Sequence, residues 1–340
     1  MAVATGRGGV GAASVGGGRG VDLRRGACED AAVAGAAAGG EAAEMIEIVA
    51  IDHFGQAVAE LEPQAEFLER VLGLRRSAEF ERPGFRGMTL AIPGSSRMGW
   101  ELLAPDGPDS YVQRFLEGVR GPGLHHIAME VKSVEATREA IRASGHEPHE
   151  DGDPHVTYLH PARGGQGFLF QFFDQHDPQS WYDVEPFEDE GEHTLGIIAV
   201  NHIAHAHAGL GELGDWYERT LGFETFWQKG SNETSGGEFQ TRVLDAPTKQ
   251  MRIEVISPTR ADSFVQRFLD ERGAAVHHLT VEVGDWERAM AALEHHGVRT
   301  FGERSSSTNG VPWRETFIHP KATGGVLLQF FWQAEPGVWI

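Results

Sequence analysis

The sequence predicts an α+β protein built from four βαβββ units, two in each half of the chain. One order returns four times: a strand-like segment, a segment of helical period, and then short strand-like runs. The segment DSYVQRFL at residues 109–116 also returns as DSFVQRFL at residues 262–269. Leu159-His160-Pro161 before a Gly-Gly pair returns as Ile318-His319-Pro320 before another such pair. Repetition of this kind indicates internal duplication.

The first unit shows the pattern most clearly. Residues 47–58 have the composition of a strand, and residues 61–72 place apolar side chains at helical spacing. Gly73 follows as a helix stop. Three strand-like runs at 76–81, 86–92 and 98–104 are divided by two Pro-Gly pairs.

The other units follow the same order. The second has a strand at 125–131, a helix from the N-cap Ser133 to Ser144, and strands near 146–149, 155–160 and 167–173. The third has a strand at 197–206, a helix at 211–221, and strands near 223–228, 238–245 and 250–257. The fourth spans 277–333, with its helix at 285–296. We therefore predict a first domain at 45–174, an acidic linker at 175–194 and a second domain at 195–340. The Gly/Ala-rich residues 1–44 are predicted to be a disordered tail.

Composition narrows the class of protein. A chain of 340 residues is long enough for two domains. Its net charge of -21 disfavours nucleic acid as a partner. No apolar run is long enough for a membrane span. The single Cys28 excludes an internal disulfide and a cysteine-based zinc site, so we expect a cytoplasmic protein that acts on a small molecule.

Four strands each carry one histidine at a comparable place. They are His53 and His126 in the first half, and His202 and His278 in the second. Side chains alternate along a strand, so His278 shares a face with Thr280 and Glu282, whereas His277 points the other way.

The last strand of each unit adds one polar residue inside an apolar run. These residues are Glu101, Gln171, Glu254 and Gln329. Burying such a side chain without a partner is costly, and the placement recurs in every unit. Each half thus offers two His, one Glu and one Gln, a set that suits Zn, Mn, Co, Ni or Fe. The alternative is that these are hydrogen-bonded core residues left over from duplication.

Over residues 46–333 the sequence resembles the vicinal oxygen chelate superfamily, which includes glyoxalases, bleomycin resistance proteins and extradiol dioxygenases. The first half is similar to methylmalonyl-CoA epimerases through Ile51-Asp52-His53, WELLAP at 100–105 and GLHHIAMEV at 123–131. The second half also resembles 4-hydroxyphenylpyruvate dioxygenases through VNHIAH at 200–205 and GVLLQFF at 325–331. The resemblance implies two cup-shaped half-barrels, each around a divalent metal.

One difference from these two families concerns the expected activity. Both of these families have Glu on the last metal-binding strand, where this chain has Gln171 and Gln329. We therefore expect an epimerase that inverts a centre next to a carbonyl through an enediolate. The tandem architecture also resembles that of 2-epi-5-epi-valiolone epimerases, and this resemblance implies a cyclitol ketone from secondary metabolism as the substrate. The alternatives are an Fe(II)-dependent dioxygenase, a glyoxalase-like lyase, and a non-catalytic protein that binds a small molecule such as a drug.

The expected catalytic base is Glu101 or Glu254. Arg314 and His319 are predicted to contact substrate, although turn capping is the alternative for His319. We expect the second half to be the active one and the protein to be a homodimer.

Overall fold

The computed structural model describes residues 45–95, 98–175, 185–229, 237–308 and 310–336, all within one compact unit. The predicted tail at 1–44 lies outside the described residues, and so does part of the predicted linker, residues 176–184. Nearly every other predicted element is present.

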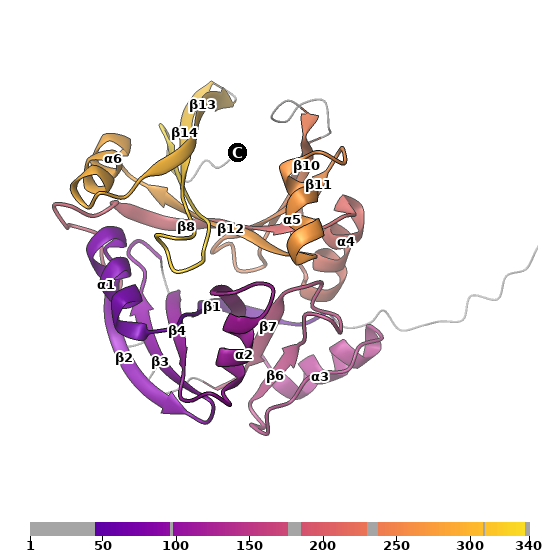
Figure 1. Ribbon diagram of the computed structural model, residues 1–340. Coiled ribbons are helices and arrows are strands. Elements are labelled where there is room, and N and C mark those ends of the chain that lie inside the picture. The colour runs from indigo at the N-terminus through magenta and orange to yellow at the C-terminus, as the bar shows by residue number, and fades with distance from the viewer. Residues whose placement is uncertain (1–44, 96–97, 176–184, 230–236, 309, 337–340) are drawn as a thin grey trace, which may run out of the picture. The chain divides into compact units, whose positions relative to one another are not determined.

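The first half contains seven strands and three helices in its described residues (Figure 1). They are β1 (Ile48–Ala57), α1 (Leu61–Leu72), β2 (Arg75–Arg82), β3 (Phe85–Ala91), β4 (Gly99–Pro105), α2 (Tyr111–Glu117), β5 (Gly123–Val131), α3 (Val134–Ala143), β6 (Val156–Leu159) and β7 (Leu169–Phe173).

The second half repeats this order with one more described strand. Its elements are β8 (Ile197–Ala206), α4 (Leu210–Leu221), β9 (Glu224–Lys229), β10 (Phe239–Asp245), β11 (Arg252–Pro258), α5 (Phe264–Arg272), β12 (Ala275–Val283), α6 (Trp286–His295), β13 (Thr300–Thr308), β14 (Val311–Ile318) and β15 (Leu328–Gln333).

Local sequence explains where the helices begin and end. Helix α1 ends at Gly73, which adopts a left-handed conformation with φ 78°, and its backbone N–H donates to carbonyls of the last turn. Helix α3 begins after Ser133, whose side chain accepts from the Ala136 N–H. The serine of the repeated Asp-Ser pair is also an N-cap: Ser110 caps α2 and Ser263 caps α5.

Two details of the predicted units were wrong. The strand expected at 146–149 is reduced to a single bridge between His149 and Tyr158, so the first sheet has one strand fewer than the second. The expected units also lacked a helix at the repeated segment, which forms α2 and α5. The first error follows from the sequence there, since Gly145, Pro148 and Gly152 interrupt any ladder.

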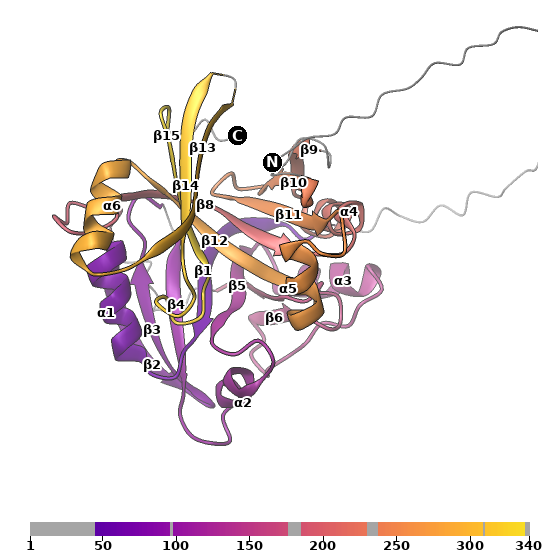
Figure 2. The same cartoon turned by 45° about the horizontal axis from the view of Figure 1, so that its top comes forward.

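Each half folds into one mixed sheet. The first has the order β2-β3-β4-β1-β5-β7-β6 and the second the order β13-β14-β15-β12-β8-β11-β10-β9. In each sheet the two histidine strands are antiparallel central neighbours, β1 with β5 and β8 with β12 (Figure 2). Each pairs on its other side with a parallel strand that carries Glu or Gln. The register of four adjacent strands therefore determines the site in each half.

The described part of the predicted linker is held against its surroundings. Asp189 accepts hydrogen bonds from the Gly191 and Gly196 N–H groups and from the Thr194 hydroxyl. Arg288 of α6 donates to the Asp189 and Gly191 carbonyls at 2.8 Å. The end of this segment is thus ordered by a buried carboxylate. The domain boundaries themselves stay a prediction.

Candidate metal centres

In the first sheet, register places the predicted ligands in two adjacent rows. Glu101 on β4 lies beside Gly55 on β1, and Gly55 lies beside His126 on β5. Two residues along, His53 on β1 lies beside Ala128 on β5, and Ala128 lies beside Gln171 on β7. Because side chains two residues apart share a face, the four polar groups point to the same side of the sheet.

The second sheet repeats both rows. Ala204 on β8 lies between Glu254 on β11 and His278 on β12. In the adjacent row, Thr280 on β12 lies between His202 on β8 and Gln329 on β15. Each row thus has a small residue in the middle, which leaves room above the sheet for the flanking side chains to converge.

In the first half three ligand-type atoms meet. The Nε2 atoms of His53 and His126 are 3.1 Å apart. The Oε2 atom of Glu101 lies 3.6 Å from the first and 3.4 Å from the second. His126 is 3% exposed and Glu101 9%, so water has little access to the group.

Neighbouring groups orient both imidazoles of this cluster. The Asp52 carboxylate accepts from Nδ1 of His53 at 2.6 Å, so Nδ1 carries the hydrogen and Nε2 faces the cluster. The Nδ1 atom of His126 lies 3.0 Å from Nδ1 of His125, whose ring packs edge-on against Phe115. Sequence reasoning missed Asp52 and His125; their positions next to ligand histidines were the available signal.

The backbone of β1 also shapes this site. A Cβ added to Gly55 would lie 2.1 Å from Cε1 of His126, so this ring rests directly on the glycine. The second half has Ala204 at the corresponding place. The first site therefore depends on a glycine and the second does not.

In the second half, Oε2 of Glu254 lies 3.6 Å from Nε2 of His202 and 3.7 Å from Nε2 of His278. The Nε2 atom of His278 is buried and has no hydrogen-bond partner. Its Nδ1 lies 2.9 Å from Nδ1 of His277, as in the first half. Asn201 replaces Asp52: its Nδ2 donates to Glu282, so its Oδ1 accepts from Nδ1 of His202 at 2.7 Å.

In the second half, hydrogen bonds link the cluster to further polar side chains. The Thr280 hydroxyl lies 3.0 Å from Nε2 of His202 and donates to Gln329 Oε1 at 2.7 Å. Gln329 Nε2 donates to Oε2 of Glu315 on β14 at 3.0 Å, and Arg304 forms an ion pair with Glu315. By register, the first half has Ala128 in place of Thr280 and Val156 in place of Glu315.

Burial dominates the electrostatics of both clusters. It lowers the pKa of His202 to about 3, with a further contribution from Arg252. It raises the pKa of Glu254 to about 8, with the Glu315 carboxylate adding to the effect. In the first half burial lowers the pKa of His53, but Glu101 and Asp52 more than offset this, so that pKa is raised. In the second half, a buried carboxyl of high pKa beside neutral imidazoles is an arrangement that a cation would stabilise.

The geometry suits one divalent ion in each half. With metal–ligand bonds of about 2.0–2.2 Å, donor atoms around one ion lie about 3 to 3.6 Å apart. The three separations in the first cluster are 3.1 to 3.6 Å. In the second, the carboxylate oxygen lies 3.6 and 3.7 Å from the two Nε2 atoms, and all three ligand atoms lie within 4.8 Å of one another. The orphaned Nε2 of His278 adds a second indication. Two His and one Glu match the donor set of Zn, Fe, Co, Ni or Mn sites.

Arg314 and His319, which were predicted to contact substrate, make other contacts in the structure. Arg314 points to the other face of its sheet, where it binds Glu287 and Glu303 and stacks over Trp286. Strand alternation explains this, since the neighbouring Glu315 takes the cluster side. His319 is exposed, and its Nδ1 accepts from the Lys321 N–H, which is the alternative turn-capping role. Glu315, which our sequence reasoning passed over, reaches the site from β14 through Gln329, and Phe317 of the same strand packs edge-on against the His278 ring.

Comparison with known proteins settles the family. The model of the Glyoxalase/Bleomycin resistance protein/Dioxygenase superfamily matches residues 52–160 and 201–317. The chain belongs to this superfamily. The two matches coincide with the two halves, so the predicted family and the predicted duplication are both confirmed.

Individual relatives within the superfamily have different activities. The ethylmalonyl-CoA/methylmalonyl-CoA epimerase of Cereibacter sphaeroides is 30% identical over 118 residues, which are 33% of this chain and 87% of that protein. The 4-hydroxyphenylpyruvate dioxygenase of Dictyostelium discoideum is 25% identical over 200 residues, 52% of this chain and 54% of that protein. The chain thus spans about half the length of this second relative.

A solved structure extends the likeness of fold across both halves. A mutant of 4-hydroxymandelate synthase from Streptomyces coelicolor superposes with a TM-score of 0.66, covering 87% of this chain and 95% of the other at 15% identity. At that identity the likeness concerns the fold alone. In the described residues no helix is long and apolar enough to cross a membrane.

Proposed function

We propose that the chain is a metal-dependent epimerase that inverts a carbon centre next to a carbonyl group. The observation that supports this most directly is the pair of buried His-His-Glu clusters, each with its imidazole Nε2 atoms turned inward. When bound, a divalent ion would polarise a substrate carbonyl and increase the acidity of the adjacent C–H. His53, Glu101 and His126 would hold it in the first half, and His202, Glu254 and His278 in the second.

The amides of Gln171 and Gln329 have a different role in this proposal from the one predicted. Gln329 uses both ends of its amide within the protein, on Thr280 and Glu315, so we assign it a positioning role. Gln171 occupies the matching place in the first half beside Ala128, where that hydroxyl partner is missing. A divalent ion held by three residues would have positions left for the two oxygens of an α-hydroxy ketone.

Glu315 is the group that we propose to move the proton. Sequence reasoning predicted Glu101 or Glu254 as base, but their carboxylates are the ones that converge with the imidazoles. Glu315 stands one side chain away, held by Gln329 and Arg304, and is 8% exposed. Its carboxylate would take the proton from one face of the substrate. Inversion then requires a proton on the opposite face, which we propose that solvent supplies.

This assignment makes the second half the catalytic one. The first half has the complete His-His-Glu cluster but has Val156 where Glu315 stands in the second half. A metal bound there would lack the adjacent carboxylate. We propose that the first site is occupied by metal and does not turn over substrate.

The substrate class is the narrower part of the proposal. The epimerase relatives support isomerisation beside a carbonyl. The acidic chain, with net charge -21, favours a neutral substrate over a polyanion. We therefore propose a cyclitol ketone of the 2-epi-5-epi-valiolone type, and a cytoplasmic homodimer as the working form.

An oxygen-dependent activity is the second candidate. Two His and one carboxylate with open positions also form the facial site of non-haem Fe(II) oxygenases. The relative of Dictyostelium discoideum, a dioxygenase, matches across more than half of this chain. The two functions differ in their need for oxygen and in their products.

Solvent exchange separates the candidates. The metal-loaded chain is incubated with the cyclitol ketone in deuterium oxide without oxygen, and deuterium at the carbon beside the carbonyl is followed by NMR. An epimerase incorporates one deuterium per inversion. His278→Ala is expected to abolish this exchange and His126→Ala to leave most of it. Oxygen uptake with no anaerobic exchange would reject the epimerase in favour of the second candidate.

A further inference from the structure

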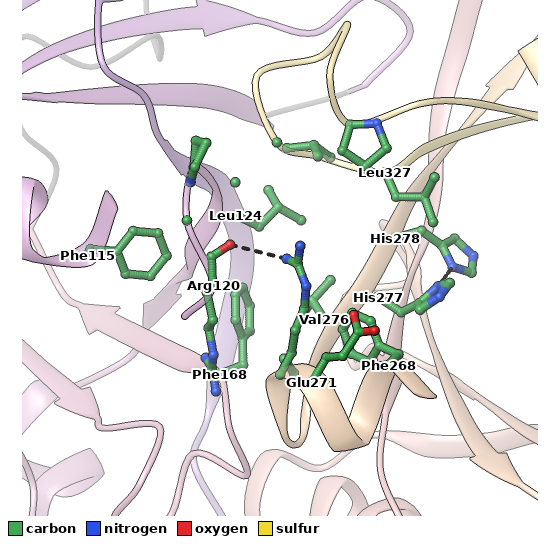
Figure 3. Close-up of a pocket in the computed structure, with 18 residues that line it drawn as sticks. Phe115, Arg120, Leu124, Phe168, Phe268, Glu271, Val276, His277, His278 and Leu327 are labelled. Carbon is green, nitrogen blue, oxygen red and sulfur yellow. Dashed lines mark hydrogen bonds between the residues drawn. The ribbon is translucent and has the colours of Figure 1, made fainter. Parts of the chain in front are cut away.

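A cavity of about 260 Å³ lies where the α2–β5 connection of the first half meets α5 and β12 of the second (Figure 3). Apolar and aromatic side chains form part of its wall. That part of the lining comprises Phe115, Leu124, Phe168, Phe268, Val276 and Leu327. A cavity with such walls and a few polar groups is typical of a small-molecule site.

The cavity borders the coordination cluster of the second half and shares one residue with it. It touches His277 and His278, but its lining does not include His202, Glu254 or Gln329. The Nδ1 atom of His277 lies 2.9 Å from Nδ1 of His278, whereas Nε2 of His278 faces the Glu254 carboxylate. An occupant would therefore lie behind a metal-facing histidine and not on the metal side of it.

Duplication brings the same two residue types to this cavity from both halves. Phe115 and Phe268 are the seventh residues of the repeated segments DSYVQRFL and DSFVQRFL. Arg120 and Arg272 each precede the paired histidines of their half by the same number of residues. Two arginines and two phenylalanines thus converge on a single space.

The charges of this cavity are unbalanced. Arg120 donates to the Gly167 carbonyl and to the Ala274 carbonyl (3.1 Å), and Arg272 donates to the Arg120 carbonyl at 3.2 Å. All these acceptors are neutral, and among the described residues neither guanidinium forms an ion pair. Burial, together with the charge of Arg272, lowers the pKa of Arg120. Glu271 is the one acidic side chain in the lining.

We propose that this cavity binds a small organic anion: an apolar or aromatic body of about ten non-hydrogen atoms that carries one carboxylate. The carboxylate would lie by Arg272, whose fork of N–H donors matches two oxygens, and the apolar body would contact Phe115 and Phe268. This site goes beyond the proposed epimerase and does not depend on it, because it uses none of the groups that would move the proton.

Binding of benzoate to the full chain tests the proposal, with benzamide as the uncharged analogue of the same shape. Titration calorimetry gives the affinity, and the ring NMR signals of His277 report the location. Benzoate is expected to bind about tenfold or more tightly than benzamide and to shift the His277 signals. Equal affinity for the two compounds, or no binding of either, would overturn the proposal.

Three substitutions on α5 sharpen the result. Arg272→Gln is expected to weaken benzoate binding about tenfold or more, and Glu271→Gln to strengthen it, because the first removes the positive charge and the second the negative one. Arg267→Gln is the matched control, since Arg267 lies outside the lining and donates to the Asp262 carbonyl. Equal losses in Arg272→Gln and Arg267→Gln would refute the site. If Arg272→Gln does not fold, the opposite effect of Glu271→Gln still decides.

Inorganic phosphate is the second probe. It carries charge without an apolar body, so it is expected to bind more weakly than benzoate. Tighter binding of phosphate than of benzoate would contradict the proposed class of ligand.

Discussion

Gly55 is a residue at which the two candidate centres differ. The ring of His126 rests on its Cα, whereas His278 stands beside Ala204. Gly55 and Ala204 occupy equivalent positions in their sheets, so the two centres differ here in the space beside the histidine ring. A methyl group is excluded at one centre and already present at the other.

Gly55→Ala is therefore expected to displace His126 and to remove metal from the first site alone. Metal content by mass spectrometry should fall from two ions per chain to one, while Ala204→Gly should leave both. An unchanged metal content in Gly55→Ala would contradict the assigned contact between His126 and the first ion.

Asp52 and Asn201 differ in charge at equivalent positions. Each accepts from the Nδ1 atom of a metal-facing histidine, at 2.6 Å and 2.7 Å. A carboxylate makes the imidazole a stronger donor than an amide does, so we expect the first site to bind metal more tightly.

Asp52→Asn is expected to weaken the first site about tenfold or more. Competition with a coloured chelator measures this, and the second site is the internal reference. If both sites weaken together, or neither does, the carboxylate has no specific effect on His53.

At the scale of elements, β14 and β15 account for the polar network of the second half. They bring Glu315 and Gln329 beside Thr280 of β12. The shorter β6 and β7 of the first half carry Val156 and Gln171 at the same register. The catalytic difference that we propose between the halves would thus be a difference between two strand pairs.

Glu315→Gln separates the proton-transfer role from metal binding. The substitution keeps the shape of the side chain and should lower solvent exchange at the substrate carbon about a hundredfold or more. Metal content should stay at the wild-type level, whereas Glu254→Gln should lower it. Full activity in Glu315→Gln would return the role of base to another residue.

Helix α5 offers a test of local stability. The Ser263 hydroxyl caps it by accepting from the Gln266 N–H at 3.0 Å, and the side chain is fully buried. Ser263→Ala is expected to lower the free energy of unfolding by about 1 kcal/mol. Urea titration measures the change, and Ser305→Ala on the exposed part of β13 should change it little. Equal effects would argue against the cap.

At the scale of the whole molecule, buried histidines make stability depend on pH. Burial lowers the pKa of His205 to about 3, and its ring is held between the Tyr217 hydroxyl and the Gln166 carbonyl. The unfolded chain takes up a proton near pH 6.5 and the folded chain does so only near pH 3. Stability is therefore complete above pH 6.5 and is lost as the pH falls through this window.

The free energy of unfolding of the metal-free chain should thus fall below pH 6.5 by about 1.4 kcal/mol per pH unit for each such histidine. Urea titrations between pH 7 and pH 5 measure the slope. His205→Asn should reduce this slope by about 1.4 kcal/mol per pH unit, which is the contribution of one histidine. A flat profile would contradict the neutral state assigned to His205.

Most strands and helices could be predicted from the sequence, because the patterns that indicate them are local or occur in every unit. Strand alternation located His53 and His278, and the return of the same strand in each unit located their partners. It did not distinguish Glu315 from Arg314, because that choice depends on which face of β14 meets the second cluster. It also could not reveal the cavity of Arg120 and Arg272, since these residues meet only when the two halves fold together.

The two copies within one chain also differ in symmetry from an assembly of identical subunits. In a two-fold homodimer every residue occurs at both equivalent centres, so a carboxylate gained by one is gained by the other. Covalent duplication removes that constraint: Thr280 and Glu315 occur at one centre, while Ala128 and Val156 occupy the other. Each centre has thus been free to change on its own while the shared backbone kept its form.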